Sequence, residues 1–168
     1  YPDAEIKTYD NAVKYIIDNT YINTDERNIL VAHQFVTSGT ESPEHSESES
    51  ISVGGIDNVD VSAFEKFDYV ALGHLHKNQK IGRDTIRYSG SPLKYSFSEV
   101  NHKKSVTIVS MLEKGNVIYE NILLSPVNDL REIKGPIAKL IDNEVLKNTN
   151  TNDYIHAILT DEEPIYDA

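Results

Sequence analysis

The fold is decided by residues 68–76, which read DYVALGHLH. The apolar run at 69–72 is short, and it is bounded by Asp68 and Gly73. Such a run favours a strand that is buried on both faces, as in a parallel sheet. Residues 28–33, which read NILVAH, have the same form. Together the two segments indicate an α/β fold in which the strands lie in one sheet.

A histidine stands at the carboxyl end of each expected strand. His33 closes the first segment, His74 closes the second, and His76 follows two residues later. Ligands of open α/β sheets gather at this edge, and imidazole suits Mn, Fe and Zn. Positions i and i+2 of an extended chain share a side, and Gly73 leaves room for a close backbone approach. A lone histidine here is more often structural, so the repeated arrangement is what predicts a metal site.

Outward from these strands, the pattern predicts a helix over residues 10–19 with Asp10 as its N-cap, and a short helix over 61–67. Two hairpins are expected, around Gly82 and around Gly115, and residues 89–92 read as a turn. Residues 37–50 are acidic and serine-rich, and they predict a long solvated surface loop.

A domain boundary is expected near Pro126, which gives domains at 1–125 and 126–168. Beyond it, the pattern predicts a strand over 129–133, a helix over 136–141, a strand over 154–159 and the start of a helix over 164–168.

Composition restricts the function classes. The 168 residues carry a formal net charge of −11, although a chain that grips DNA phosphates usually has a basic face. There are no cysteines, so disulfides and thiolate metal sites are excluded, and a cytoplasmic location is expected. No apolar run approaches the roughly 20 residues of a membrane span. The first residue is Tyr1 and the only Met is Met111, so a piece of a longer protein is expected.

No chemistry is assigned to the other polar candidates. His45 and His102 are expected in solvent, and His156 is expected to be structural within its strand. Ser89 and Ser91 lack an apparent Asp–His relay and are interpreted as turn residues. Tyr88 and Lys94 form a weaker hypothesis, that of a surface facing nucleic acid.

Several motifs resemble one family closely. They are VAHQF at 31–35, VGG at 53–55, FDYVALGHLH at 67–76 and YSGSPLKYS at 88–96. Together they resemble the SbcD-type exonuclease subunits of the calcineurin-like metallophosphoesterase superfamily, over residues 10–165. The resemblance implies the second half of an α/β/β/α sandwich, followed by the start of a small α+β capping domain that guides DNA.

The resemblance also implies a site and partners. Two Mn²⁺ ions are expected in the intact enzyme, with His33 and His74 on one ion and His76 on the other. It implies exonuclease action on double-stranded DNA ends and endonuclease action on single strands or hairpins. The implied partners are an SbcC-type ATPase subunit, DNA and a second copy in a homodimer, with no membrane.

The sequence departs from the family in one important respect. The earlier motifs Asp-x-His, Gly-Asp-x-x-Asp and Gly-Asn-His-Asp/Glu are absent from the 168 residues. They supply the bridging carboxylate and the histidine thought to protonate the leaving oxygen, so no catalytic residue is assigned and the chain alone is expected to be inactive. Two alternatives stay open: a phosphoesterase acting on nucleotides or phosphoproteins, and a non-catalytic scaffold.

Overall fold

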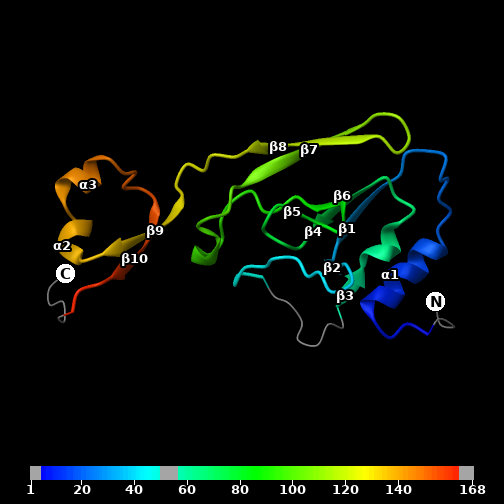
Figure 1. Cartoon of the computed structure of the whole chain (residues 1–168), viewed down its shortest axis with the longest axis horizontal. Helices are drawn as coiled ribbons and strands as arrows, with labels where there is room; N and C mark the ends of the chain where they lie inside the picture. Colours follow the sequence, from blue (N-terminus) through cyan, green and yellow to red (C-terminus); the bar gives the residue numbers. More distant parts are fainter. Residues whose placement is uncertain (1–4, 50–56, 163–168) are drawn as a thin grey trace.

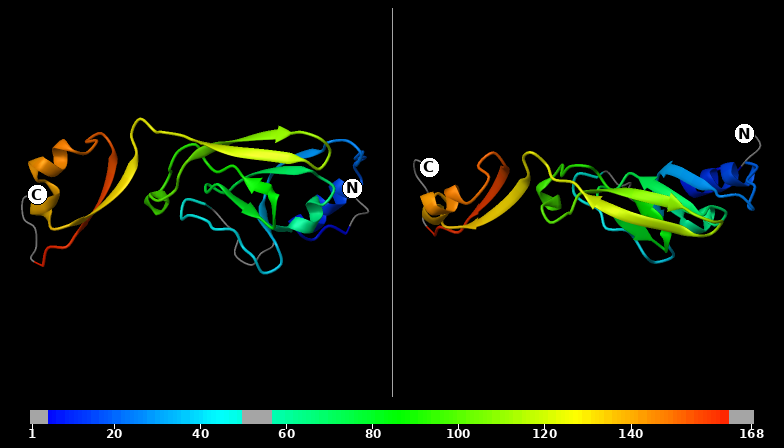
Figure 2. Two further views of the ribbon diagram at one scale, coloured as in Figure 1. Left: turned by 45° about the horizontal axis from the view of Figure 1, so that its top comes forward. Right: turned by 90° about the horizontal axis from the view of Figure 1, so that it is seen from above.

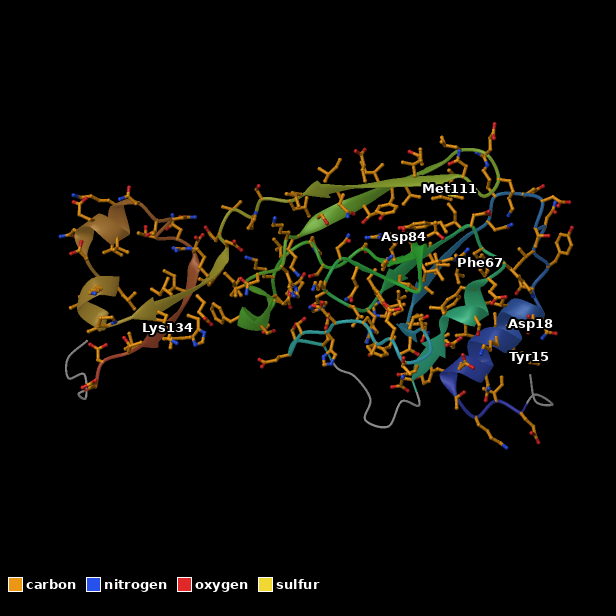
Figure 3. The ribbon with its side chains drawn as sticks, viewed as in Figure 1. Tyr15, Asp18, Phe67, Asp84, Met111 and Lys134 are labelled. Atoms are coloured by element: carbon orange, nitrogen blue, oxygen red, sulfur yellow. The ribbon has the colours of Figure 1, made fainter. Side chains whose placement is uncertain are left out.

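The computed structural model describes residues 5–49 and 57–162. The chain forms an elongated molecule with a main body and a small carboxy-terminal unit (Figures 1 and 2). Tyr15 and Asp18 in the body and Lys134 in the small unit lie toward opposite ends of the molecule (Figure 3). Within the described residues, no helix has the length and apolar character needed to cross a membrane.

A four-stranded sheet in the order β1-β4-β6-β5 is the centre of the body. Its strands are β1 (Ile29–His33), β4 (Tyr69–Gly73), β5 (Gln79–Ile81) and β6 (Arg83–Tyr88). β1, β4 and β6 run parallel, and β5 returns antiparallel to β6. The two segments that predict the parallel sheet are therefore neighbours, and His33 pairs in register with Gly73.

One face of this sheet is covered by α1 (Tyr9–Asp18), the 3-10 helix η1 (Val61–Phe64) and the small parallel pair β2 (Phe35–Thr37) and β3 (Asn58–Asp60). The hydrophobic core lies between these layers. Its buried residues are Ile17, Phe35, Val36, Val59, Ala63, Phe64, Phe67, Val70, Leu72, Leu75, Ile81, Ile86 and Tyr88. The mixed α/β class expected from the strand patterns is confirmed.

The opposite face of the sheet meets the antiparallel hairpin of β7 (Ser105–Met111) and β8 (Val117–Leu123). The Arg87 guanidinium of β6 lies 4.1 Å from the centroid of the Tyr119 ring. Asn78 donates to the Thr107 hydroxyl at 3.0 Å and to Asn121 Oδ1 at 3.2 Å. This interface is thus held by a cation–π contact and by polar side chains rather than by apolar packing alone.

After the hairpin, the chain forms the small unit of β9 (Leu130–Gly135), α2 (Ile137–Leu140), α3 (Asn143–Lys147) and β10 (Tyr154–Leu159). β9 and β10 pair in parallel. Lys94 reaches this unit through an ion pair with Asp129 at 3.0 Å. A second 3-10 helix, η2 (Phe97–Glu99), approaches it as well, with the Phe97 ring centroid 5.2 Å from that of His156.

Several expectations about elements need correction. Thr8, not Asp10, caps α1, because its side chain accepts from Asn11 N at 3.1 Å. Asp10 lies in the first turn, where it accepts instead from Asp60 N at 3.0 Å and pairs with Lys14. The helix expected over 61–67 is the shorter η1, and the helix expected over 164–168 lies outside the described residues.

β1 is not buried on both faces. Val31 is 79% exposed and Ile29 is 51% exposed, whereas β4 is buried as expected. β1 is the edge strand of the sheet, and its alternate residues Leu30 and Ala32 pack against the core. His33 shares the exposed side of β1 with Ile29 and Val31, because alternate residues of a strand point the same way.

Candidate metal centre

His33 and His74 lie side by side at the carboxyl ends of β1 and β4. Their ring centroids are 5.4 Å apart, with the rings nearly perpendicular at 81°. The position of the His33 ring requires glycine at position 73, because a Cβ there would lie 2.8 Å from His33 Nδ1. The close approach expected at Gly73 is therefore made by the His33 imidazole.

His74 has an unusual backbone. Its φ of +97° is positive, and no other non-glycine residue in the described part of the chain has a positive φ. Residues other than glycine are strained in this region, and such strain concentrates at functional sites. Burial lowers the pKa of the His74 imidazole below its ordinary value, and the nearby His33 lowers it further. His74 is therefore favoured as a neutral ring, the form that binds cations.

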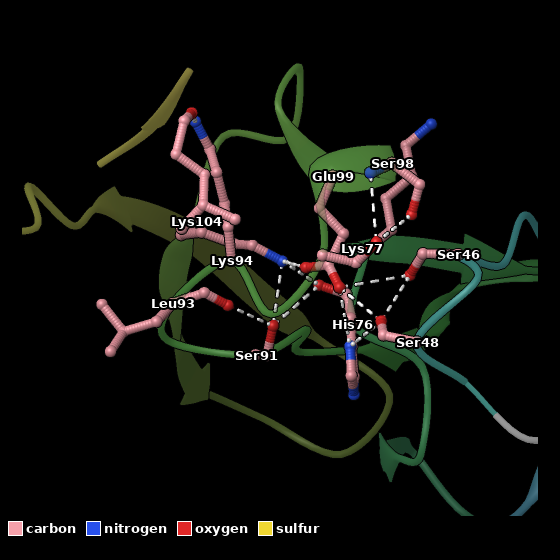
Figure 4. A network of polar contacts seen from close by, with 12 residues as sticks. Ser46, Ser48, His76, Lys77, Ser91, Leu93, Lys94, Ser98, Glu99 and Lys104 are labelled. Atoms are coloured by element: carbon pink, nitrogen blue, oxygen red, sulfur yellow. Dashed lines mark hydrogen bonds and ion pairs between the residues drawn. The ribbon is translucent and has the colours of Figure 1, made fainter. Parts of the chain in front are cut away.

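His76 is held by a different set of groups (Figure 4). Its Nδ1 lies 3.0 Å from Glu99 Oε1 and 3.0 Å from the Ser48 hydroxyl. The Tyr95 ring is tilted over it, with centroids 5.3 Å apart. All these polar contacts use Nδ1, so they fix the ring through one nitrogen.

Glu99 is completely buried, which a lone carboxylate could not tolerate. Lys104 Nζ donates to Glu99 Oε2 at 2.6 Å, and it also donates to the His76 carbonyl at 3.0 Å and to Ser91 Oγ at 2.9 Å. Burial alone would raise the pKa of Glu99, but hydrogen bonds from Lys104, Ser48 and His76 lower it to about 2. The carboxyl is therefore ionised at neutral pH.

The acidic segment 37–50 is only partly the solvated loop that its composition predicts. Ser46 is buried, and Ser48 donates to Glu99 Oε1 at 2.6 Å. Glu49 accepts hydrogen bonds from the backbone N–H groups of both Ser46 and His76. This segment thus packs around His76 and Glu99 through its serine hydroxyls and one carboxylate, while its other glutamates, such as Glu44, stay exposed.

The turn after β6 lies close to the backbone that follows His76. Gly90 has φ +80°, and a Cβ there would lie 2.9 Å from both Asn78 N and the His76 carbonyl oxygen.

The hypothesis that Tyr88 faces nucleic acid is wrong, because its side chain is fully buried. The Tyr88 hydroxyl accepts from Val36 N at 2.7 Å and donates to the Gln34 carbonyl at 3.0 Å, and burial raises its pKa to about 12.

The remaining histidines are His45, His102 and His156, and they take no part in the contacts described above. His45 is exposed, as expected. His102, expected in solvent, is instead half-buried, and its Nδ1 has no hydrogen-bond partner. Burial accordingly lowers the pKa of His102. His156 lies on β10 at 3.3 Å from Glu132, an exposed pairing.

The donor set fits part of a coordination shell. The ring centroids of His33 and His74 lie 5.4 Å apart, close enough for the two imidazoles to share one cation, and a Cβ at Gly73 would meet the His33 ring. No group of three potential ligands converges on one point among residues 5–49 and 57–162. A cavity of about 480 Å³ lies elsewhere, next to Lys94, His102 and Pro126. His33 and His74 are therefore two potential ligands that lie together at the carboxyl edge of the sheet.

A mixed α/β chain with two histidines at neighbouring carboxyl ends is consistent with part of a metallophosphoesterase-type protein. The comparison with curated proteins is more specific. The chain is 35% identical over 171 residues to the SbcD subunit of the SbcCD nuclease of Staphylococcus epidermidis, a match that covers 99% of the chain. This similarity confirms the resemblance to SbcD-type subunits that the motifs indicate. The chain spans 44% of that relative's length, and no family model matches it.

Proposed function

We propose that this chain supplies His33, His74 and His76 to the metal centre of an SbcD-type nuclease subunit. The observation that carries the proposal is the contact between the His33 and His74 rings at the carboxyl edge of the sheet. The 35% identity to an SbcCD nuclease subunit along nearly the whole chain supports the nuclease over other metal chemistry. In this arrangement His33 and His74 share one ion and His76 ligates a second.

The cation proposed is Mn²⁺, as the resemblance to SbcD-type subunits implies; imidazole binds divalent transition metals, and carboxylate is a preferred ligand of Mn²⁺. When bound, such ions polarise a phosphate and lower the pKa of a water molecule. The chain's own residues position the ligands: Gly73 leaves room for the His33 ring, whose centroid lies 5.4 Å from that of His74, and Glu99 contacts His76 Nδ1. The 168 residues lack the three family motifs that contain the bridging carboxylate and the general acid. Turnover is therefore proposed to require a polypeptide that supplies them.

The substrate proposed for the intact protein is DNA, cleaved from double-stranded ends and within single strands or hairpins. The proposed partners are an SbcC-type ATPase subunit and a second copy of the protein. The unit formed by β9, β10, α2 and α3 is proposed to begin a domain that guides DNA, with residues 1–125 forming the phosphoesterase part. We propose that the DNA contacts of this chain lie near the bound cations, because a net charge of −11 leaves no excess of basic side chains.

Calorimetric titration with Mn²⁺ tests the metal proposal, and the chain offers a matched control because it has six histidines. Replacing the three site histidines by alanine is expected to abolish Mn²⁺ binding. The control variant carries alanine at the other three positions, namely His45, His102 and His156, and should bind like the unaltered chain. Equal Mn²⁺ affinity in both triple variants would contradict the proposal.

Nuclease assays test the second part of the proposal. The 168-residue chain is expected to leave linear duplex and hairpin DNA intact in the presence of Mn²⁺, since the bridging carboxylate is missing from its sequence. Adding a polypeptide with the three missing motifs is expected to restore Mn²⁺-dependent cleavage, and this cleavage should be lost when His33 or His74 is replaced by alanine. Robust cleavage by the 168-residue chain alone would refute this part.

A substrate comparison with the same combined polypeptides distinguishes a nuclease from a phosphoesterase that acts on nucleotides or phosphoproteins. DNA phosphodiesters should be hydrolysed, and phosphoserine peptides and nucleoside monophosphates should remain intact. Preferential hydrolysis of the monoesters would assign the site to the alternative class.

A further inference from the structure

The hydrogen bonds around His76 determine which of its two nitrogens carries the proton. Glu99 is ionised beside Lys104, and an ionised carboxylate can only accept. Its Oε1 lies 3.0 Å from His76 Nδ1, so Nδ1 must be the donor in this contact. A neutral imidazole has one N–H, which leaves Nε2 with a free lone pair.

Ser48 agrees with this assignment. Its hydroxyl has one hydrogen, and the contact of 2.6 Å to Glu99 Oε1 takes it. The Ser48 oxygen at 3.0 Å from His76 Nδ1 is therefore a second acceptor for the same N–H. Both contacts therefore have Nδ1 as the donor, the Ser48 contact because its own hydrogen goes to Glu99.

We infer that Glu99 is a positioning residue that fixes the tautomer and the ring direction of His76, so that Nε2 is presented to a divalent cation. The inference rests on the proposed function for its cation, but the tautomer itself follows from the contacts of this chain. Carboxylates commonly take the second nitrogen of metal-ligating histidines in this way, and their removal lowers metal affinity by roughly 10–100-fold.

The surroundings of Glu99 suit this task. It ends the 3-10 helix η2, whose N-cap Ser96 accepts from Ser98 N at 3.1 Å. Lys104 bridges the Glu99 carboxylate and the backbone carbonyl of His76, so a single buried ammonium group fixes both partners of the contact. The carboxylate, the histidine backbone and the ring therefore form one closed network (Figure 4).

The first test is nitrogen NMR of the histidine rings in the 168-residue chain at pH 8, where an ordinary imidazole is neutral. His76 is expected to carry its proton on Nδ1. In Glu99→Gln, Lys104 should attract the amide oxygen, which turns the amide NH₂ group toward His76 Nδ1 and moves the ring proton to Nε2. An Nε2-protonated His76 in the unaltered chain would overturn the inference, and so would an unchanged tautomer in the variant.

The second test is Mn²⁺ affinity, measured from the electron paramagnetic resonance signal of free Mn²⁺. Glu99→Gln is expected to weaken binding by roughly 10–100-fold. Glu132→Gln is the matched control, because it removes an exposed carboxylate from beside His156, at 3.3 Å, and should leave affinity unchanged. A purely structural Glu99 would lower the thermal midpoint without altering the Mn²⁺ affinity of the folded protein, and that result would also overturn the inference.

A backup variant covers loss of folding. Glu99→Gln leaves Lys104 as an unpaired buried charge, so Glu99→Gln/Lys104→Gln removes both charges and keeps hydrogen-bonding groups in place. This double variant should fold, and its His76 should no longer be held in one tautomer. The two hypotheses fail differently: if His76 has the expected tautomer but no histidine variant alters Mn²⁺ affinity, the metal proposal is wrong, and only the tautomer fixed by Glu99 stands.

Discussion

Replacing Tyr88 by phenylalanine tests how the end of β1 is held in place. The Tyr88 hydroxyl accepts from Val36 N at 2.7 Å and donates to the Gln34 carbonyl at 3.0 Å, directly after His33. Tyr88 and Val36 are both fully buried, so water cannot replace the lost hydroxyl. The benzene ring of phenylalanine keeps the packing, and the variant therefore isolates the two hydrogen bonds.

The expected cost follows from the group left without a partner. A buried N–H that loses its acceptor costs about 1–3 kcal/mol, and we expect about 2 kcal/mol for Tyr88→Phe. For a chain of this size that corresponds to a decrease of about 4–8 °C in the thermal midpoint. Because burial raises the pKa of Tyr88 to about 12, the hydroxyl is neutral and the loss should be the same at pH 6 and pH 9.

Urea denaturation followed by circular dichroism measures the difference in free energy of unfolding. Tyr21→Phe is the control, since Tyr21 is 90% exposed, and it should change the free energy little. A Tyr88→Phe variant as stable as Tyr21→Phe would refute the reasoning. So would an effect that appears at pH 9 and vanishes at pH 6.

Three further predictions concern Gly73, Gly90 and Asp68. Gly73→Ala should weaken Mn²⁺ binding while the fold is kept, because its Cβ would lie 2.8 Å from His33 Nδ1; calorimetry with unchanged affinity would contradict this. Gly90→Ala should lower the midpoint of urea denaturation more than Gly115→Ala, because the two share φ values of +80° and +78° but only Gly90 has backbone atoms within 3 Å of a Cβ; equal losses would argue against the steric cause. The side chain of Asp68 is 6% exposed and accepts hydrogen bonds from two backbone N–H groups and a lysine, which hold its pKa below the ordinary 3.8 although burial alone would raise it. Its contribution to stability is therefore present above about pH 4 and is lost as pH falls through the folded-state value. Acid titration should therefore erase the stability difference between the unaltered chain and Asp68→Asn, and a constant difference would exclude this role.

The central elements could be predicted because their patterns are local. A short apolar run with flanking Asp68 and Gly73 specifies β4, and glycines at Gly82 and Gly115 specify the two hairpins. The contact of His33 with His74 also follows from pattern, since parallel neighbours end at one edge. Sequence reasoning therefore locates the edge at which the histidines meet.

The burial of β1 could not be predicted in the same way. Its residues are as apolar as those of β4, but pattern does not reveal which strand lies at the edge of a sheet. The N-cap of α1 is misplaced by the sequence pattern for a related reason. Thr8 and Asp10 are both good capping residues, and the choice is made by a long-range bond from Asp60 N to the Asp10 carboxylate.

The groups that support His76 escape sequence reasoning because they are distant along the chain. Glu99 follows it by 23 residues and Ser48 precedes it by 28. One signal is available: a glutamate five residues before a lysine, in a segment next to the turn at 89–92, is compatible with a buried pair. Charge composition hides it, because Glu99 and Glu49 are indistinguishable from the exposed glutamates of this acidic chain.

The central claim is that three imidazoles form one side of a metal centre. It is tested most directly by titrating Mn²⁺ into the chain and recording the histidine-ring signals by NMR, since a bound paramagnetic ion broadens the nuclei closest to it. The signals of His33, His74 and His76 should broaden first, at Mn²⁺ concentrations that leave His45, His102 and His156 sharp. Broadening of all six signals together, or of the second set first, would contradict the claim.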